Sequence, residues 1–395
     1  MQPAEPHADA PTHEESDQPS PGPGYQPRQL LLLGSGHAHV HVLQALAASP
    51  LVGVRVVLVA PHPRQVYSGM VPGFVAGHYP LDDCSIALEP LVRRAGVRWL
   101  QRSVRHLDAN HRAVLLDDGS RVQYDWLSIN TGPVQNREQI ERDIPGAREH
   151  GLFMRPIEGF AALWPQVAQM GAKRPLRVTV VGGGTTGFEL ACAVRQRLAN
   201  AAVTLLAGPS VIGDNYPHAV QQRMVQALKA RRITVLQEVA TAIKADEVRL
   251  GCGARLACDV SIVANGVQPP LWLAASGLQL DAKGLVSVNA FLQSVNHPTV
   301  FAVGDICSRA DQPDRPLARG AQTVHAGPAL AQNLGYATGG DPLRAYEPAR
   351  NALALISCGN RYAIASWGNR SAEGHWVWWL KNWIDRRFVA RHSAS

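Results

Sequence analysis

Several features that mark other classes of protein are missing from this 395-residue sequence. No stretch comes near the ~18 uninterrupted apolar residues that a membrane-spanning helix needs. The amino end has no basic segment followed by an apolar core, so it does not predict a secretory signal. The six cysteines form no CxxC or CxxxxC pair, which excludes a redox-active disulfide between near neighbours in the sequence. We therefore expect a cytoplasmic protein whose thiols are reduced.

Basic residues are absent from the first 27 positions, which hold seven prolines and five acidic residues. Such a segment buries too little apolar surface to offset its ordering entropy, so we predict a disordered tail over residues 1–27. Without these five negative charges the net charge of +7 becomes +12 for the rest of the chain. This charge favours anionic partners such as dinucleotides or an anionic lipid surface. No motif of a nucleic-acid-binding module accompanies it, so we expect no nucleic acid as a partner.

Two glycine-rich turns each join a predicted strand to a predicted helix. The first, Gly34–Gly36, follows an apolar run and precedes a helix over His37–Ala47. The second, Gly182–Gly187, follows the β-branched run Leu176–Val181. Strand, glycine turn, helix and strand form a right-handed βαβ unit, which implies a parallel sheet. The sequence thus predicts an α/β fold with two Rossmann-like domains, the second inserted in the first.

Glycines at these spacings allow a tight turn and a close approach of the backbone to a pyrophosphate at the start of a helix. The second turn is a complete motif and predicts a dinucleotide site. The first turn has His39 at the third glycine position, so we expect its helix not to pack closely on the strand. Ala60 and Ala207 occupy the positions where an acid usually binds the ribose hydroxyls. The choice between NADH and NADPH therefore stays open.

Three histidines, His37, His39 and His41, alternate at the start of the first predicted helix. Two ligands spaced i and i+4 on a helix can share one metal ion, which makes a metal site one interpretation. However, this string lies where a pyrophosphate should bind, and His39 would point elsewhere. We favour helix packing and phosphate contact, and expect no metal.

Three motifs together resemble a known group of enzymes: Gly34–Val40 (GSGHAHV), Tyr67–Gly73 (YSGMVPG) and Trp383–Phe388 (WIDRRF). Over about residues 29–392 the chain resembles the pyridine nucleotide-disulfide oxidoreductase superfamily, and within it the type II NADH dehydrogenases and sulfide:quinone reductases. It most resembles a subfamily often fused to selenophosphate synthetase. The resemblance implies FAD and NAD(P)H as cofactors, an FAD-binding domain over 28–157 and 284–340, an NAD(P)-binding domain over 158–283, and a C-terminal domain over 341–395.

The same resemblance implies which residues hold the two cofactors. The FAD pyrophosphate would lie at Gly34, Ser35, Gly36, His37 and Ala38, and the isoalloxazine against Met70, Pro72, Thr131 and Gly132. Asp305, in a Gly304-Asp305 motif, would hydrogen-bond the ribityl chain. The nicotinamide dinucleotide would be held by Gly182, Gly183, Gly184, Thr185, Thr186 and Gly187, with Gly266 nearby.

Three further residues are candidates for catalysis. Glu189 would point toward the nicotinamide, although an acid in the first turn of a helix also favours the helix dipole. His325 stands where type II NADH dehydrogenases carry a glutamine pair near the quinone; it could donate a proton to the acceptor or face solvent. Cys307, just past Asp305, is the first thiol that a sulfide or selenide oxidase would need, with Cys84 or Cys358 as the second.

The resemblance implies an FAD-dependent enzyme that passes hydride from NAD(P)H to the flavin and on to an acceptor, a quinone by analogy. Two alternatives stay open: a sulfide or selenide:quinone oxidoreductase, and a non-enzymatic flavoprotein whose redox state governs docking to a partner, such as selenophosphate synthetase. A homodimer is also left open. Residues 376–391 hold four of the nine tryptophans beside Arg and Lys, which is typical of a helix in a membrane interface. The alternative is a terminal helix docked on its own domain; in the first case the protein lies on the inner face of the cell membrane.

Overall fold

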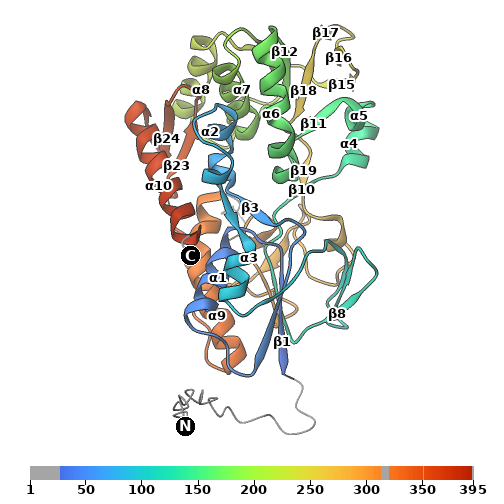
Figure 1. Cartoon of the computed structure of the whole chain (residues 1–395), viewed down its shortest axis with the longest axis vertical. Helices are drawn as coiled ribbons and strands as arrows, with labels where there is room; N and C mark the ends of the chain where they lie inside the picture. Colours follow the sequence, from blue (N-terminus) through green and yellow to red (C-terminus); the bar gives the residue numbers. More distant parts are fainter. Residues whose placement is uncertain (1–26, 313–319, 350, 394–395) are drawn as a thin grey trace, which may run out of the picture.

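The computed structural model describes residues 27–312, 320–349 and 351–393, with side chains omitted for 320–323. The tail predicted over residues 1–27 lies outside the described residues, apart from Pro27. Two domains are stacked along the long axis of the molecule, and the C-terminal segment runs beside both of them (Figure 1). Each domain contains a parallel sheet, so the predicted α/β architecture is confirmed.

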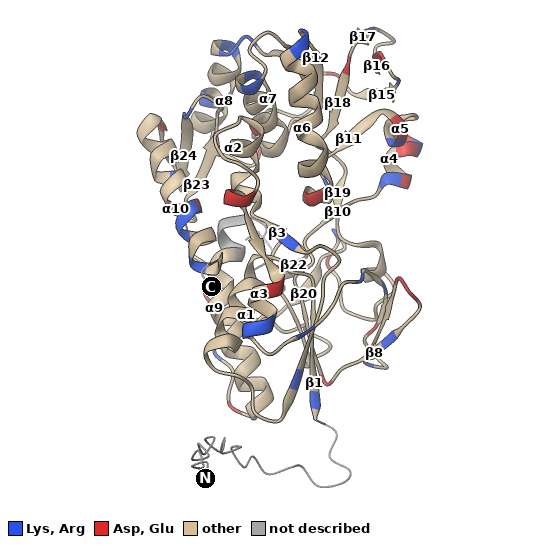
Figure 2. Ribbon diagram, viewed as in Figure 1, with Lys and Arg blue, Asp and Glu red and all other residues tan. Residues whose placement is uncertain are grey.

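The first sheet has five parallel strands, and its centre is the leucine-rich strand β1. The strand order is β21 (Val300–Ala302), β9 (Trp126–Ile129), β1 (Arg28–Leu33), β2 (Val54–Val59) and β5 (Arg98–Leu100). The four leucines Leu30–Leu33 are fully buried, and the charge that Figure 2 shows on β1 lies at its start, at Arg28. The surrounding helices are α1 (His37–Ala48), α3 (Leu88–Arg94) and α9 (Gly320–Gly339), and α1 packs against α9.

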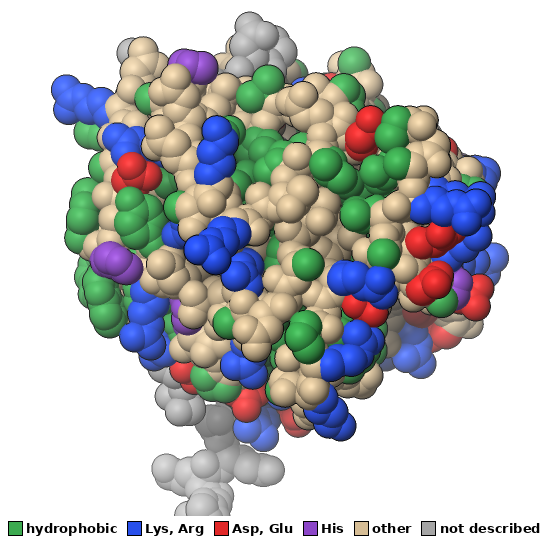
Figure 3. Space-filling model, turned by 90° about the horizontal axis from the view of Figure 1, so that it is seen from above, with side chains coloured by type: hydrophobic (Ala, Val, Ile, Leu, Met, Phe, Trp, Pro, Cys, Tyr) green, Lys and Arg blue, Asp and Glu red, His purple; other side chains and the backbone are tan. Residues whose placement is uncertain are grey.

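The second sheet repeats this plan. Its parallel order is β11 (Gly151–Phe153), β18 (Val260–Val263), β12 (Arg177–Val181), β13 (Ala202–Leu206) and β14 (Thr234–Leu236). Its helices are α6 (Ile157–Lys173), α7 (Thr185–Arg197) and α8 (His218–Ala230). An antiparallel sheet accompanies each domain: β6 (Val104–Asp108), β7 (Ala113–Leu116) and β8 (Arg121–Gln123) in the first, and β15 (Ala240–Ile243), β16 (Glu247–Leu250) and β17 (Arg255–Ala257) in the second. Figure 3 views the molecule from above, toward the second domain, and shows Lys and Arg side chains spread over this surface.

Two short strands mark where the chain passes between the domains. Strand β10 (Val134–Gln135) carries it out and β19 (Val267–Gln268) brings it back, paired antiparallel. Both crossings come earlier than the predicted boundaries at 157 and 283. Residues 151–153 already form a strand of the second sheet, and Leu273 and Leu278 already pack in the core of the first domain. Strand β11 is three residues long, too short for its periodicity to show in the sequence.

The C-terminal segment packs on both domains. It forms β23 (Ala354–Ser357), β24 (Ala363–Trp367), β25 (Arg370–Gly374) and α10 (His375–Ser393). Ile356 joins the core of the second domain, whereas Val377 and Phe388 join that of the first. Within the described residues, no helix is both long and apolar enough to span a bilayer.

The remaining short elements connect these layers or lie along the boundary between the domains. They are β3 (Arg64–Val66), η1 (Ser68–Met70), α2 (Val71–Val75), η2 (Asp82–Cys84), β4 (Ser85–Ala87), α4 (Arg137–Asp143), α5 (Ala147–His150), η3 (Leu271–Leu273), β20 (Val286–Val288) and β22 (Cys307–Arg309).

Candidate functional site

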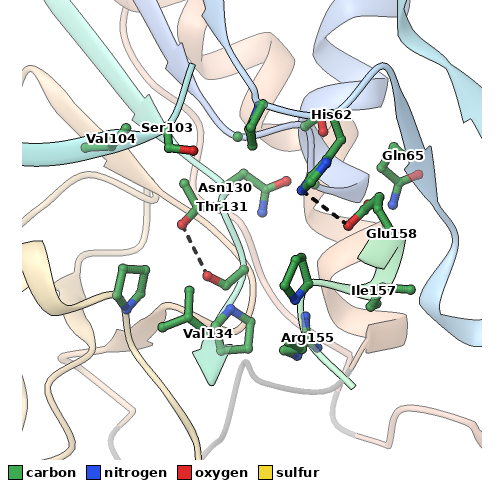
Figure 4. Close-up of a pocket in the computed structure, with 18 of the residues that line it drawn as sticks. His62, Gln65, Ser103, Val104, Asn130, Thr131, Val134, Arg155, Ile157 and Glu158 are labelled. Carbon is green, nitrogen blue, oxygen red and sulfur yellow. Dashed lines mark hydrogen bonds and ion pairs between the residues drawn. The ribbon is translucent and has the colours of Figure 1, made fainter. Parts of the chain in front are cut away.

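A cavity of about 480 Å³ lies beside the first glycine turn, between the two domains. Figure 4 shows side chains from both domains around it, with Asn130 and Thr131 on one side and Arg155, Ile157 and Glu158 on another. Its wall contains most of the first group of predicted cofactor residues: Gly34, Ser35, Gly36, His37, Thr131, Gly132 and Asp305. Because parallel strands end together at one edge of a sheet, residues distant in sequence meet here.

The first glycine turn needs glycine because it touches the end of strand β9. Gly34 has φ +86°, and a Cβ there would lie 2.5 Å from Cα of Thr131. A Cβ on Gly36 would lie 2.3 Å from Oδ1 of Asn130. Asn130 was not predicted. Its Oδ1 accepts hydrogen bonds from the backbone N–H groups of Ala38 and His39, and its Nδ2 donates to Val303 O at 2.8 Å. One amide side chain thus joins the turn to two strands, and Ala38 is buried in this contact region.

His39 shows why the turn tolerates the loss of its third glycine. Its ring is fully buried; Nδ1 lies 2.6 Å from Gly34 O and Nε2 lies 2.8 Å from Ser128 Oγ. Because a carbonyl can only accept, Nδ1 carries the proton and Nε2 accepts from the Ser128 hydroxyl. Burial lowers the pKa of His39 to about 4, so the ring is neutral. We predicted that helix α1 would not pack closely on the strand. Instead, the His39 ring lies buried between α1 and β9 and is held by two hydrogen bonds.

The other two histidines of the string face helix α10. His37 contacts the rings of Tyr67 and Phe388, and His41 Nδ1 lies 3.3 Å from Nε2 of His392. Among the described residues, no group of three or more His, Cys, Asp and Glu side chains is placed to hold a metal ion. His37 therefore contributes to the cavity wall and, like His41, to the docking of α10.

Three polar atoms that face or border the cavity lack a hydrogen-bond partner within the described part of the chain: Asp305 Oδ1, His37 Nε2 and Gln65 Oε1. Unpartnered buried polar atoms are costly, so such a group in one place indicates a ligand with hydroxyl or phosphate groups. Burial raises the pKa of Asp305, and the charge of Arg155 acts against this rise. These residues fit the ribityl and pyrophosphate groups of a bound FAD.

Arg155 is a cavity residue that the sequence did not reveal. It lies in the second domain, between strand β11 and helix α6, and its backbone N–H donates to Gln135 Oε1 at 2.7 Å. Burial lowers the pKa of its guanidinium, while Asp305 and Glu158 act in the opposite direction. Glu158 Oε2 lies 3.9 Å from His62 Nε2 of the first domain, the pair drawn in Figure 4. The cavity thus combines a buried cation with two carboxylates.

Two glycines of the second turn lie so close to backbone atoms that a side chain would not fit. A Cβ on Gly187 would lie 1.8 Å from Gly182 O, and one on Gly183 would lie 2.4 Å from Ala207 O. Around Gly184, in contrast, the space is open within 4 Å. Helix α7 begins at Thr185, followed by Thr186, and its N-cap residue supplies no side-chain hydrogen bond. Free N–H groups beside an open glycine suit a pyrophosphate.

Two further glycines occupy matching places in the two domains. Gly132 follows β9 with φ +71°, and Gly266 follows β18 with φ +69°. Each lies just before one of the two crossing strands, β10 and β19. Their contact with a nucleotide stays a prediction. Gly304, with φ +87°, accepts the N–H of Cys307 through its carbonyl and sets the turn that places Asp305 at the cavity.

Glu189 is held by the C-terminal segment. Its Oε1 accepts the backbone N–H of Ser357 at 2.7 Å. Burial raises its pKa to about 7, with the ammonium of Lys381 acting against this rise. The first turn of α7 contains no acid, so the alternative of a first-turn acid is wrong. Its role toward the nicotinamide stays a prediction.

The resemblance places Tyr67–Pro72 along the isoalloxazine, with Met70 and Pro72 nearest, and of this segment Ser68 lines the cavity. Gln65, Val66 and Ser68 form the cavity wall, whereas Met70 and Pro72 are buried within η1 and α2. Side chains in this buried turn pack against the core and not against the cavity. The sequence pattern alone does not show which of these two surroundings a side chain has.

The thiols predicted for sulfide chemistry are buried and apart from the cavity wall. Cys307 is 1% exposed, and burial raises its pKa far above the usual range. Burial also raises the pKa of Cys84 to about 12, and that of Cys358 well above its usual value. The nucleophilic form is the thiolate, which these surroundings disfavour. His325 is exposed on α9, as the solvent-facing interpretation expects.

Known proteins share this fold and part of the sequence. The chain is 24% identical over 321 residues to an alternative NAD(P)H-ubiquinone oxidoreductase C1 of Arabidopsis thaliana, an alignment that covers 71% of this chain and 61% of the plant protein. Two solved structures match the fold. One is the sulfide:quinone oxidoreductase of Aquifex aeolicus (TM-score 0.73, 17% identity, 93% of this chain and 91% of the other), and the second is NDH2 of Plasmodium falciparum (TM-score 0.72, 13% identity, 93% and 98%).

The model of the pyridine nucleotide-disulphide oxidoreductase family matches residues 28–333, which include both parallel sheets and both glycine turns. The match confirms the predicted class of oxidoreductase with two dinucleotide-binding domains. The chain belongs to the pyridine nucleotide-disulphide oxidoreductase family.

Proposed function

We propose that this protein oxidises NAD(P)H through a bound FAD and passes the electrons to a quinone. The observation that carries the proposal is that the first glycine turn, Asp305 and Arg155 line one interdomain cavity, while a second dinucleotide-type glycine turn opens helix α7 in the other domain. Gly34–His37 and Asp305 line that cavity from the first domain, and Arg155 lines it from the second. An enzyme with separate sites for two nucleotides on stacked sheets can bring them together at the boundary between its domains.

Each part of the site has a distinct task in this reaction. FAD supplies the chemistry, because its ring system accepts hydride from a nicotinamide and returns electrons to an acceptor. The first glycine turn and the backbone N–H of His37 at the start of α1 would hold the pyrophosphate, and Asp305 would hold the ribityl hydroxyls. Arg155 places a positive charge in the same cavity. This charge would stabilise negative charge on a bound cofactor that is removed from water there. Gly182–Gly187 and the start of α7 hold the nicotinamide dinucleotide.

An anaerobic titration tests the proposal. Purified protein loaded with FAD should lose its flavin absorbance on addition of NADH or NADPH, and a soluble ubiquinone analogue should restore it. Retention of the oxidised spectrum with both nucleotides would refute the first half of the reaction. Bleaching by a nucleotide without reoxidation by any quinone would refute the choice of acceptor.

Contact with a membrane is part of the proposal, because quinones are lipid-soluble. Helix α10 docks on the protein through the face that contains Trp378, Lys381 and Asp385. Trp376, Trp379 and Trp383 are left on the opposite face, with 59%, 57% and 58% of their surface exposed. The buried face fits a helix docked on its own protein, and the exposed tryptophans support contact with a membrane, since tryptophans on an exposed helix face are typical of membrane interfaces.

The alternative activities have less support. A sulfide or selenide oxidase needs two thiols near the flavin, and the buried Cys307, Cys84 and Cys358 are absent from the cavity wall. A non-enzymatic role, a selenophosphate synthetase partner and a homodimer stay predictions of the sequence. Of these, the partner is the simplest to examine, by co-purification with the flavin-loaded protein.

A further inference from the structure

The second nucleotide site lacks the acid that usually binds the adenosine ribose, because Ala207 occupies this position directly after strand β13. The neighbouring strand β14 has an acid close to this position. Leu206 and Leu236 are paired residues at the ends of the two strands, so the residues that follow them leave the sheet side by side. The backbone N–H of Ala207 donates to Leu236 O at 2.9 Å, and that of Gly208 donates to Glu238 O at 3.2 Å. Glu238 therefore stands next to the place of the missing acid.

The carboxylate of Glu238 is held by the tip of the β16–β17 hairpin. Its Oε2 accepts the backbone N–H of Cys252 at 3.3 Å, and a Cβ on Gly251 would lie 3.4 Å from the same atom. The side chain is half-buried. A carboxylate has acceptor sites for several hydrogen bonds, so one contact with the hairpin leaves capacity for a ligand.

Space for a sugar exists beside this carboxylate. Gly208 has φ +69°, and a Cβ there would meet no heavy atom within 4 Å. Gly183 of the glycine turn lies against Ala207, the residue before Gly208, so the turn and this open position are neighbours. The segment 208–214 (GPSVIGD) contains no Lys or Arg to bind a 2′-phosphate.

We propose that Glu238 replaces the ribose-binding acid of the second nucleotide site and makes the protein select NADH over NADPH. The inference rests on the proposed function and assigns its nicotinamide specificity. The carboxylate accepts hydrogen bonds from the ribose hydroxyls of NADH. With NADPH, the 2′-phosphate brings negative charge against a fixed negative charge, and like charges at close range disfavour binding.

Binding of the redox-inert NAD⁺ and NADP⁺ to the FAD-loaded protein, measured by calorimetry, tests the inference without turnover. The wild type should bind NAD⁺ more tightly than NADP⁺. In Glu238→Gln, the affinity for NAD⁺ should fall about tenfold, because a hydrogen bond to a charged group becomes a neutral one. The preference for NAD⁺ over NADP⁺ should narrow, and kinetics should show a raised KM for NADH with kcat unchanged.

Glu149→Gln is the matched control, since it removes the same charge from the same domain at a side chain that is 81% exposed. It should leave both affinities at their wild-type values. Equal affinity of the wild type for NAD⁺ and NADP⁺, or an unchanged preference in Glu238→Gln, would overturn the role of Glu238. Failure of NADH to bleach the flavin would instead overturn the proposed function, whatever the two binding constants are.

Discussion

The carboxylate of Glu189 accepts a hydrogen bond from the backbone N–H of Ser357 at 2.7 Å and thereby joins helix α7 to the C-terminal sheet. Helix α7 starts at the nucleotide-binding turn, whereas the C-terminal sheet leads into α10. Lys381 of α10 adds an electrostatic link to the same carboxylate. The nucleotide site and the helix with exposed tryptophans are therefore connected through one largely buried acid.

Glu189 should make stability depend on pH. Its pKa is about 7 in the folded protein, above the ordinary value of 4.5, so the folded state holds the proton more tightly than the unfolded state. The free energy of unfolding should thus fall as pH rises from about 4.5 to about 7. Glu189→Gln lacks this loss, and its stability relative to wild type should rise across that window by up to about 3 kcal/mol. Urea denaturation from pH 4.5 to 8 measures the difference.

Glu149→Gln again serves as the comparison, because the same charge is removed from an exposed side chain. Its stability relative to wild type gives the effect of removing one exposed negative charge from the same domain. A constant difference between Glu189→Gln and wild type at every pH would show that Glu189 titrates normally.

Lys381 should be required for the docking of α10. Its Nζ donates to Asp385 Oδ2 at 2.5 Å and to Gly69 O at 2.6 Å, and both side chains are nearly buried. Lys381→Met leaves the Asp385 carboxylate without its cation, which should lower the free energy of unfolding by about 3 kcal/mol. Chemical denaturation followed by tryptophan fluorescence measures this loss. The double variant Lys381→Met, Asp385→Leu should regain most of it, and a double variant as unstable as the single one would contradict the argument.

The sequence predicted the fold well where local patterns decide it, and missed what distant contacts decide. Both glycine turns and the insertion of one domain in the other follow from local strand–turn–helix patterns. His39 was expected to disturb packing, yet Ser128, from a strand far along the chain, gives it a partner. Asn130 and Arg155 carry no motif, and their roles arise because the end of β9 and the loop between β11 and α6 meet at the cavity beside the first glycine turn. A polar residue directly after a buried strand, as in 126–130, is a signal that could have revealed Asn130.

Arg155 should be needed to retain FAD. Its buried guanidinium lies in the cavity with Asp305, at the boundary that the cofactor would cross. Arg155→Gln removes a charge-assisted contact, which should weaken FAD binding about tenfold or more. The ratio of flavin to protein absorbance after dialysis, and a fluorescence titration of the apoprotein, measure the affinity.

Arg155→Lys keeps the charge but not the planar fork, so its affinity should lie between those of Arg155→Gln and the wild type. Circular dichroism separates loss of FAD from loss of fold. Wild-type affinity in a folded Arg155→Gln protein would exclude contact between this residue and the cofactor.

The exposed tryptophan face of α10 should bind lipid. Trp376, Trp379 and Trp383 point away from the core, and the guanidinium of Arg387 lies 5.4 Å from the centre of the Trp383 ring. Apolar burial and attraction to anionic headgroups act together for such a helix. Wild-type protein should therefore co-sediment with vesicles that contain phosphatidylglycerol, and less with neutral vesicles. Replacement of all three tryptophans by serine should reduce binding at least tenfold, because each tryptophan buries a large apolar area.

A serine at Trp367 is the control, since that residue is 52% exposed but lies on β24, outside the helix. Its vesicle binding should equal that of the wild type. The triple variant should keep its flavin reduction by NADH, because the three side chains do not line the cavity, and lose activity toward a membrane-embedded quinone while a soluble analogue still reacts. Unchanged vesicle binding by the triple variant would exclude the tryptophan face as the site of membrane contact.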